Sequence, residues 1–98
     1  MSHAVRVDPE RHEIDLLLEM APELRGARVL EVGCGDGRLT KLYAHLASGV
    51  LAIDPSERRI EAARSASVAQ SVRFRRAGIE DVRRSAVAFD VGILAWSL

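Results

Sequence analysis

The fold of this chain is decided by the stretch Val29-Leu-Glu-Val-Gly-Cys-Gly-Asp-Gly-Arg-Leu-Thr40. The stretch begins as a short apolar run, continues through a loop with glycine at every second position, and ends where a helical pattern begins. Glycines allow the backbone to turn sharply and let a ligand lie against bare amides. A strand, a glycine loop and a helix in this order are typical of a ligand-binding loop at the carboxyl end of the first strand of a parallel sheet.

Strands and helices alternate on both sides of this loop. We expect a first helix that begins near Asp8 and Pro9 and ends between Leu24 and Gly26. Strands are predicted at 28–32, 50–53, 72–75 and 89–95, and helices at 39–46, 57–67 and 80–85. Short connections between them imply right-handed βαβ crossovers. The predicted fold class is therefore α/β, a partial Rossmann-like three-layer sandwich whose mostly parallel sheet has strand order 3-2-1-4 and is truncated after the fourth strand.

Composition limits the domain organisation and the partners. The chain has 98 residues, enough for one small domain that spans residues 1–98. Its 14 basic and 14 acidic residues balance, so net charge gives no reason to expect nucleic acid or an anionic membrane as a partner. No apolar run is long enough to span a membrane. The single cysteine, Cys34, cannot form an intramolecular disulfide, which favours the cytoplasm. We interpret the arginines that crowd the second half as solvated surface, with a contact surface as the alternative.

The glycine spacing bears on the kind of ligand. Gly33, Gly35 and Gly37 follow the pattern G-x-G-x-G, whereas a dinucleotide-binding loop needs G-x-G-x-x-G. Arg38 stands where the third glycine of that motif is required. The spacing argues against NAD, and by itself it is a weak signal for any nucleotide-like ligand.

Two acidic residues make the signal more specific. Glu31 comes two residues before the loop, and Asp54 ends the second predicted strand, where a carboxylate can accept both ribose hydroxyls of an adenosine. Glu31 is then expected near an ammonium group of the ligand. The alternative for Asp54 is a helix N-cap, because Asp-Pro-Ser also caps well, although Ser56 could serve as the cap in its place. Because the glycine loop accompanies Asp54 in the sequence, we favour ribose binding over capping for this residue.

These segments resemble the class I S-adenosylmethionine-dependent methyltransferase family. Residues 29–40 are similar to its first motif, E/D-x-G-x-G-x-G, and residues 52–56, 77–81 and 89–98 are similar to its second, third and fourth motifs, in the same order. The resemblance covers nearly the whole chain and implies S-adenosyl-L-methionine as the cofactor. The chain departs from the family at Gly78, where the family often has an acidic residue, and in lacking the fifth to seventh strands of the family's sheet.

The resemblance also implies a role for individual residues. The glycine loop would hold the methionine part of the cofactor, with Glu31 oriented toward its amino group and Asp54 bound to the ribose. Pro55 would flank the adenine, Ile79 and Glu80 would contact the adenine ring and its amino group, and Ala95 would pass near the methionine end. The implied cofactor-binding residues are Glu31, Gly33, Cys34, Gly35, Gly37, Asp54, Pro55, Ile79, Glu80 and Ala95. No metal is expected.

Less can be said of the acceptor. Residues 89–98 lack the Asn/Asp-Pro-Pro-Tyr pattern that marks amino-group methylation in this family, so the resemblance favours a small-molecule methyl acceptor. No catalytic residue can be named, and none of His3, His12 and His45 stands out as a general base. The alternative function is a non-catalytic S-adenosylmethionine-binding module that needs a partner or a C-terminal half. The fourth strand is expected to be an open sheet edge, hence a candidate for dimerisation.

Overall fold

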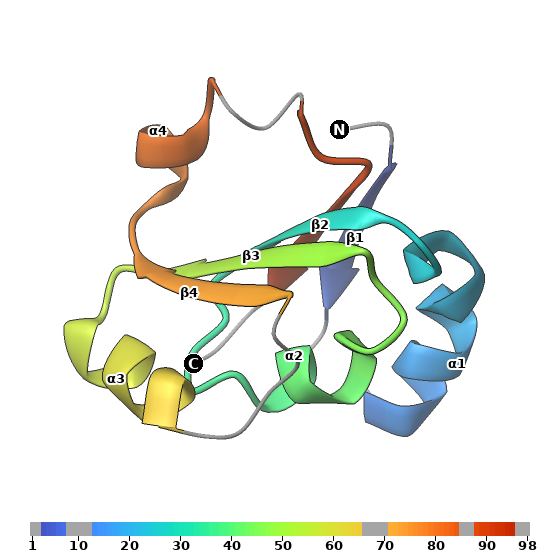
Figure 1. Cartoon of the computed structure of the whole chain (residues 1–98), viewed down its shortest axis with the longest axis horizontal. Helices are drawn as coiled ribbons and strands as arrows, with labels where there is room; N and C mark the ends of the chain where they lie inside the picture. Colours follow the sequence, from blue (N-terminus) through green and yellow to red (C-terminus); the bar gives the residue numbers. More distant parts are fainter. Residues whose placement is uncertain (1–2, 8–12, 66–70, 85–87, 96–98) are drawn as a thin grey trace.

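The glycine loop joins a buried strand to a short helix in the computed structural model (Figure 1). The structure describes residues 3–7, 13–65, 71–84 and 88–95. Its elements, in chain order, are β1 His3–Val7, α1 Glu13–Leu24, β2 Arg28–Val32, α2 Arg38–Tyr43, β3 Gly49–Asp54, α3 Glu57–Ser65, β4 Val72–Arg76, α4 Ile79–Val82 and β5 Val91–Ala95. The α/β class predicted from the sequence is confirmed.

The strands form a parallel sheet of order β1-β5-β2-β3-β4 within the described residues. The four predicted strands are β2, β3, β4 and β5, and their order of 3-2-1-4 is confirmed. The central strand β2 pairs Leu30 with Leu51 of β3 on one side and with Gly92 of β5 on the other. Because all the pairs are parallel, the carboxyl ends of β2, β3, β4 and β5 share one edge of the sheet.

The strand β1 was not predicted. Residues 3–7 were interpreted as part of a polar lead, but their backbone pairs in parallel with β5, from His3 opposite Val91 to Val7 opposite Ala95. The expectation that the fourth strand is an open edge is therefore wrong, and with it the argument for dimerisation through that strand. The physical reason is that the unpaired backbone groups of β5 are satisfied by a strand from the other end of the described chain.

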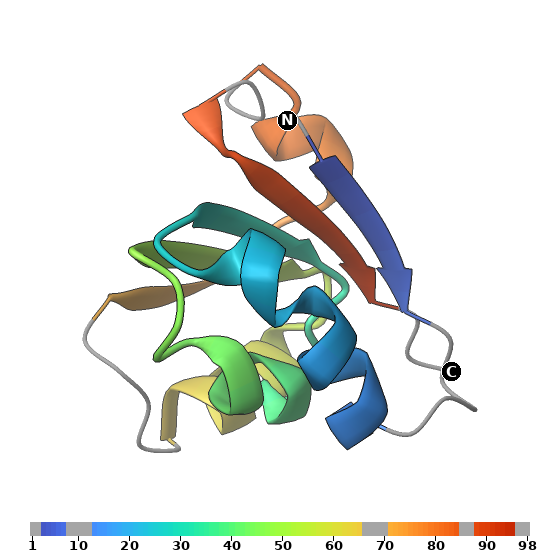
Figure 2. The ribbon, with the colours of Figure 1, turned by 90° about the vertical axis from the view of Figure 1, so that its right-hand side faces the viewer.

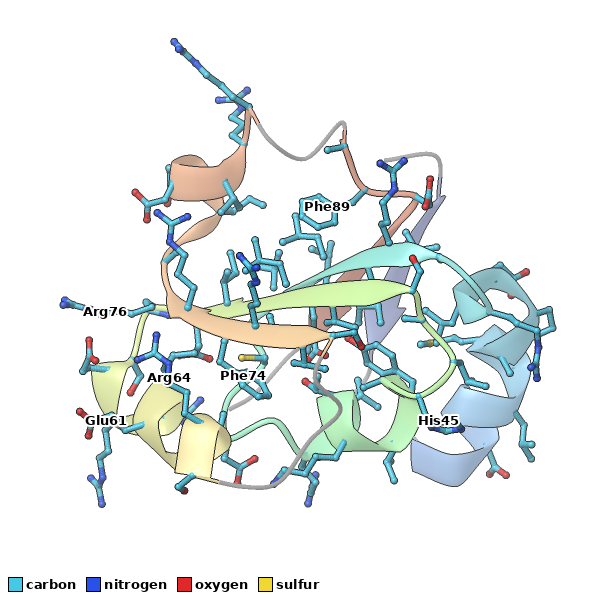
Figure 3. The ribbon with its side chains drawn as sticks, in the orientation of Figure 1. His45, Glu61, Arg64, Phe74, Arg76 and Phe89 are labelled. Atoms are coloured by element: carbon cyan, nitrogen blue, oxygen red, sulfur yellow. The ribbon has the colours of Figure 1, made fainter. Side chains whose placement is uncertain are left out.

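Helices cover both faces of the sheet. Figures 1 and 2 show α1, α2 and α3 together on one face and α4 on the opposite face, which confirms the three-layer arrangement. Alternation along β2 assigns Val29 to the larger core beneath the three helices and Leu30 to the smaller core beside α4. In Figure 3, Phe74 and Phe89 lie on these two opposite faces. Glu31 is two residues from Val29 and lies on the same face of β2, so its side chain points toward the helices.

The predicted ends of the elements are mostly close to the observed ones. Gly26 has φ 72° after the end of α1, as expected for a residue that closes a helix. The helix α3 ends at Ser65 and α4 begins at Ile79, each within two residues of its predicted position. The predicted start of the first helix at Asp8 and Pro9 lies outside the described residues, as do residues 96–98.

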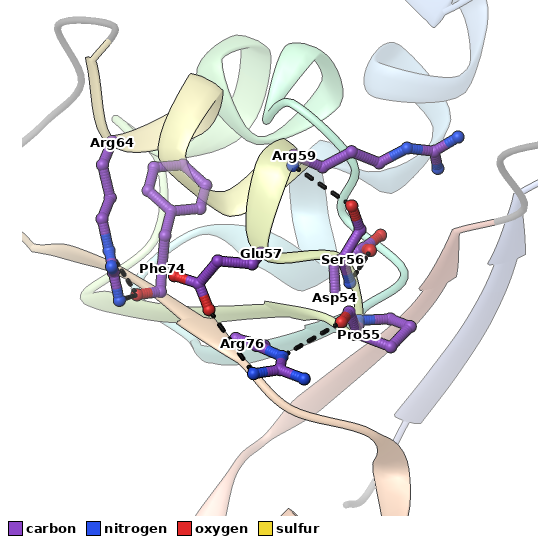
Figure 4. Close-up of polar contacts among 8 residues, drawn as sticks. All are labelled: Asp54, Pro55, Ser56, Glu57, Arg59, Arg64, Phe74 and Arg76. Carbon is purple, nitrogen blue, oxygen red and sulfur yellow. Dashed lines mark hydrogen bonds and ion pairs between the residues drawn. The ribbon is translucent and has the colours of Figure 1, made fainter.

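Exposed arginines and a buried phenylalanine alternate along β4. Phe74 is buried against α3, whereas Arg73 and Arg75 are exposed on the other face. Arg64 of α3 donates two hydrogen bonds to the carbonyl oxygen of Phe74, at 3.2 Å from Nε and 2.9 Å from Nη2 (Figures 3 and 4). This side chain occupies an acceptor on a strand at the edge of the sheet, which makes further strand pairing there less favourable.

The packing of α1 predicts unequal effects for two leucines of that helix. Leu24 is fully buried in the larger core, whereas Leu18 is 70% exposed. We expect Leu24→Ala to lower the free energy of unfolding by about 2–5 kcal/mol, and Leu18→Ala to change it by less than about 0.5 kcal/mol. Urea denaturation followed by circular dichroism measures both. Similar losses for the two variants would contradict the observed packing of α1.

Candidate cofactor site

The loop between β2 and α2 depends on three glycines in the left-handed region. Gly33, Gly35 and Gly37 have φ values of 80°, 57° and 84°. A Cβ on Gly33 would lie 2.5 Å from the carbonyl oxygen of Ala95, and one on Gly37 would lie 3.0 Å from Cζ of Phe74. Among the described residues, no atom lies within 4 Å of the corresponding position at Gly35. Packing therefore excludes a side chain at Gly33 and allows one at Gly37 only if Phe74 shifts, while the described residues leave space beside Gly35.

Four of the backbone amides of this loop have acceptors. Gly33 and Cys34 both donate to the carbonyl oxygen of Ile53, at 2.8 and 3.0 Å. Gly35 donates to Oδ2 of Asp54 at 3.0 Å, and Gly37 donates to the carbonyl oxygen of Cys34 at 3.0 Å. Loops that bind phosphate do so with free amides that point at the anion. The hydrogen bonding thus agrees with the glycine spacing in arguing against a dinucleotide.

Asp54 connects the end of β3 to the glycine loop. Its side chain is 3% exposed, and its Oδ1 accepts a hydrogen bond of 2.9 Å from the amide of Ser56, while Oδ2 accepts the bond from Gly35. Ser56 itself caps α3, because its Oγ accepts a bond of 3.3 Å from the amide of Arg59 (Figure 4). A carboxylate has about four acceptor positions. The two bonds of Asp54 therefore occupy two of these positions among the described residues.

Glu31 is the most unusual residue of the site. It is fully buried, and its Oε1 accepts hydrogen bonds from Oγ1 of Thr40 at 2.8 Å and from the hydroxyl of Tyr43 at 2.6 Å. Its Oε2 is also buried and has no hydrogen-bond partner among the described residues. Burial raises the pKa of Glu31 from 4.5 to about 7, although the bonds from Tyr43 and Thr40 act in the opposite direction. An acidic side chain with an unsatisfied oxygen is costly inside a protein and would be stabilised by a cationic partner.

The cysteine of the loop is not a candidate nucleophile. Cys34 is 7% exposed, and burial, with the nearby charges of Glu31 and Asp54, raises the pKa of its thiol to about 12. The thiol is therefore protonated at neutral pH, and a protonated thiol is a poor nucleophile. Cys34 is therefore a small, buried residue of the loop.

The remaining predicted residues surround this centre at the ends of the neighbouring strands. Ala95 ends β5 directly beside Gly33, so the structure brings these two together. Pro55 is exposed after β3, and its carbonyl oxygen accepts a bond of 3.4 Å from Nε of Arg76 (Figure 4). Ile79 and Glu80 form the exposed first turn of α4, one strand further along the sheet.

Two residues of the site were not predicted from the sequence. Thr40 and Tyr43 are fully buried on α2 and meet at Glu31. The available signal was the spacing, since residues three apart on a helix share a face and a buried glutamate requires donors from the helix that covers it.

The comparisons with known proteins agree with this geometry. The family model for methyltransferase domains matches residues 29–98. The chain belongs to the class I S-adenosylmethionine-dependent methyltransferases. S-adenosylmethionine is accordingly the cofactor of this domain.

Individual relatives give the extent of the similarity. A ubiquinone biosynthesis O-methyltransferase of Methylocella silvestris is 41% identical over 69 residues, which are 68% of this chain and 27% of that protein. A malonyl-[acyl-carrier protein] O-methyltransferase of Salmonella typhimurium is 34% identical over 88 residues, 90% of this chain and 33% of that protein. The crystal structure of an S-adenosylmethionine-dependent methyltransferase from Mesorhizobium loti matches with a TM-score of 0.60 at 34% identity, over 71% of this chain and 33% of that one. The chain thus spans about a third of the length of these relatives.

Other kinds of site find no support in the described part of the chain. No group of three or more His, Cys, Asp or Glu side chains there is arranged to hold a metal ion. Among the described helices, none combines the length and the apolar character needed to cross a membrane. His45 is exposed, as expected for a residue on the outer side of its segment.

The raised pKa of Glu31 predicts how stability depends on pH. Between pH 4.5 and about 7 the folded chain holds the Glu31 proton more tightly than the unfolded chain does, so stability falls as the pH rises through this window. The difference between 4.5 and about 7 corresponds to about 3 kcal/mol, at about 1.4 kcal/mol per pH unit. Urea denaturation at pH 5 and pH 8 measures the change.

The control for this experiment is Glu31→Gln, which has no proton to lose. We expect the fall in stability between pH 5 and pH 8 to shrink by most of that amount in the variant. An equal fall in the wild type and in Glu31→Gln would show that Glu31 has an ordinary pKa and is not buried as described.

Proposed function

We propose that this domain takes part in methyl transfer from S-adenosylmethionine to an acceptor, and that it binds the cofactor between Glu31, the glycine loop and Asp54. The observation that carries the proposal is the buried carboxylate of Glu31, with Oε2 unpartnered among the described residues, two residues before a loop in which four backbone amides have acceptors. This arrangement suits a ligand with an ammonium group better than one with a phosphate.

The other end of the site suits an adenosine. Asp54 has two acceptor positions left after its bonds to Gly35 and Ser56, one for each ribose hydroxyl. Gly35 donates its amide to Asp54, and no atom of the described residues lies within 4 Å of the position of a Cβ on it, which supports a ligand that passes over it. We therefore infer that the methionine part lies toward Glu31 and the adenosine toward Asp54.

The remaining residues are assigned from their places around this path. We propose that Gly33, Cys34 and Gly37 shape the loop, and that Ala95 borders the methionine end because it lies against Gly33. Pro55, at the exposed end of β3, is proposed to flank the adenine. Ile79 and Glu80 are proposed to contact the adenine from the first turn of α4.

The chemistry of the reaction is carried by the cofactor. When bound, S-adenosylmethionine supplies a methyl group on a sulfonium sulfur, which is a good leaving group. The residues of this chain then have to orient the cofactor and keep its position fixed, which is the main contribution an enzyme makes to such a transfer. Asp54 and Glu31, both buried and held by hydrogen bonds, are suited to that task.

We further infer a small-molecule acceptor. Two relatives are named as O-methyltransferases, one of ubiquinone biosynthesis and one of malonyl-[acyl-carrier protein], which supports oxygen as the atom methylated.

We also propose that residues 1–98 form one domain, the N-terminal cofactor-binding part of the protein. Its sole cysteine, buried and with a raised pKa, supports a location in the cytoplasm.

A second candidate function is a cofactor-binding module without catalysis of its own. It is favoured by the extent of the similarity, because the chain covers only 27–33% of the relatives named above. Residues that bind the acceptor would then be supplied by another part of the protein or by a partner. Cofactor binding without transfer to any phenol or carboxylic acid tested would support this candidate.

Calorimetric titration tests the proposal directly. We expect S-adenosylmethionine and S-adenosylhomocysteine to bind the wild-type chain and NAD not to bind. Asp54→Ala should weaken binding by about 1–3 kcal/mol through the loss of hydrogen bonds to the ribose. A folded wild-type chain that binds neither cofactor form, or that prefers NAD, would contradict the proposed site.

Gly35 offers a test that separates binding from backbone strain. Gly35→Ala and Gly26→Ala both place an alanine at positive φ with no atom within 4 Å of the new Cβ, so both should lower stability by a similar amount, about 1–2 kcal/mol. We expect only Gly35→Ala to weaken the binding of S-adenosylhomocysteine, by at least tenfold, because the methyl group of the new alanine enters the path of the ligand. Calorimetry and thermal denaturation measure the two effects. Equal affinities for the two variants would place the ligand elsewhere.

A further inference from the structure

The bonds around Glu31 are distributed unequally between its two oxygens. Oε1 accepts two hydrogen bonds, from Thr40 at 2.8 Å and from Tyr43 at 2.6 Å. Oε2 is equally buried and accepts none among the described residues. A network that served only to satisfy a buried carboxylate would supply donors to both oxygens, since each unsatisfied acceptor costs about 1–3 kcal/mol.

The two donors come from a single face of α2. Thr40 and Tyr43 are three residues apart in the helix, and both are fully buried against β2. Two short bonds to the same oxygen fix the rotation of the carboxylate, because turning it would break both of them. The orientation of Oε2 is thereby set by hydroxyl groups that a ligand has no need to touch.

We propose that Thr40 and Tyr43 are positioning residues for the amino-acid end of the cofactor, holding Glu31 by Oε1 so that Oε2 serves the ligand's ammonium group. This inference rests on the proposed function of the site. Because Oε2 is itself buried, its contact with the ammonium group forms either through a bridging water or after a small shift of the loop. Both ways require a carboxylate of fixed orientation.

The protonation states of the surrounding groups are compatible with this role. Burial, together with the charge of Glu31, raises the pKa of Tyr43 well above 10 and that of Cys34 to about 12, so both groups stay protonated at neutral pH. Tyr43 is therefore a permanent donor in the range in which Glu31 titrates. Its hydroxyl favours the ionised form of Glu31, which is the form that an ammonium group requires.

The experiment compares two ligands that differ in the amino-acid end. S-adenosylhomocysteine carries the ammonium group, whereas 5′-methylthioadenosine has the same adenosine and thioether but no amino acid. We expect Tyr43→Phe and Thr40→Val each to weaken the binding of S-adenosylhomocysteine by about fivefold to tenfold. The same variants should weaken the binding of 5′-methylthioadenosine by less than twofold. Calorimetric titration measures both affinities, and circular dichroism checks that the variants fold.

Ser65→Ala is the matched control. It removes a hydroxyl that donates to the carbonyl oxygen of Ala62 at the exposed end of α3, and it should change neither affinity. A loss of affinity of equal size for the two ligands in Tyr43→Phe and Thr40→Val would overturn the inference, because it would indicate a structural role. Equal affinity of the wild type for the two ligands would also overturn it, while leaving the adenosine end of the proposed site intact. A wild type that binds neither ligand overturns the proposed function itself.

A measurement without ligand covers the case of a poorly folded variant. The carboxyl carbon of Glu31 can be titrated by nuclear magnetic resonance in the wild type and in whichever hydroxyl variant folds. Loss of either donor should raise the pKa of Glu31, since both bonds lower it in the wild type. An unchanged pKa would show that the two hydroxyls do not hold the carboxylate and would overturn the inference.

Discussion

The hydrogen bond from the amide of Gly35 to the carboxylate of Asp54 holds the candidate site together. It joins the loop after β2 to the end of β3, and the amides of Gly33 and Cys34 reinforce the connection through Ile53. Each of these bonds depends on the parallel pairing of β2 with β3, which brings the two strand ends side by side. The three positive φ values of the loop follow from the same constraint, because the chain must turn back across the end of β3 to reach α2.

Glu31 and Asp54 lie near this junction in different environments. Asp54 is bonded through both oxygens to backbone amides, which fixes the orientation of its side chain. Glu31 is bonded through one oxygen to two hydroxyl groups, and its pKa is raised to about 7. In the proposed function, the first arrangement serves the neutral hydroxyl groups of a ribose and the second serves an ammonium group. S-adenosylmethionine carries these groups in its adenosine part and in its amino-acid part.

Much of this could be predicted from the sequence because it depends on local pattern. The apolar run of β2 and the glycine loop have clear signals, and Asp54 could be placed near the loop once the sheet was taken as parallel. The strand β1 could not be predicted, since its pairing with β5 is a contact between backbones that are distant in the sequence. The hydrogen bonds of Thr40 and Tyr43 to Glu31 depend on how α2 packs across β2, which helical periodicity alone does not determine. The unequal hydrogen bonding of the two oxygens of Glu31 depends on atomic positions, which only the structure provides.

A crystal structure of the chain with S-adenosylhomocysteine would show both ends of the proposed site at once. We expect the ribose hydroxyls to lie within hydrogen-bond distance of Asp54 and the ligand to pass over Gly35. We also expect the ammonium group to be paired with Oε2 of Glu31, directly or through one water molecule. A ligand bound in the opposite direction, or one that leaves Glu31 and Asp54 without contact, would contradict the proposed site.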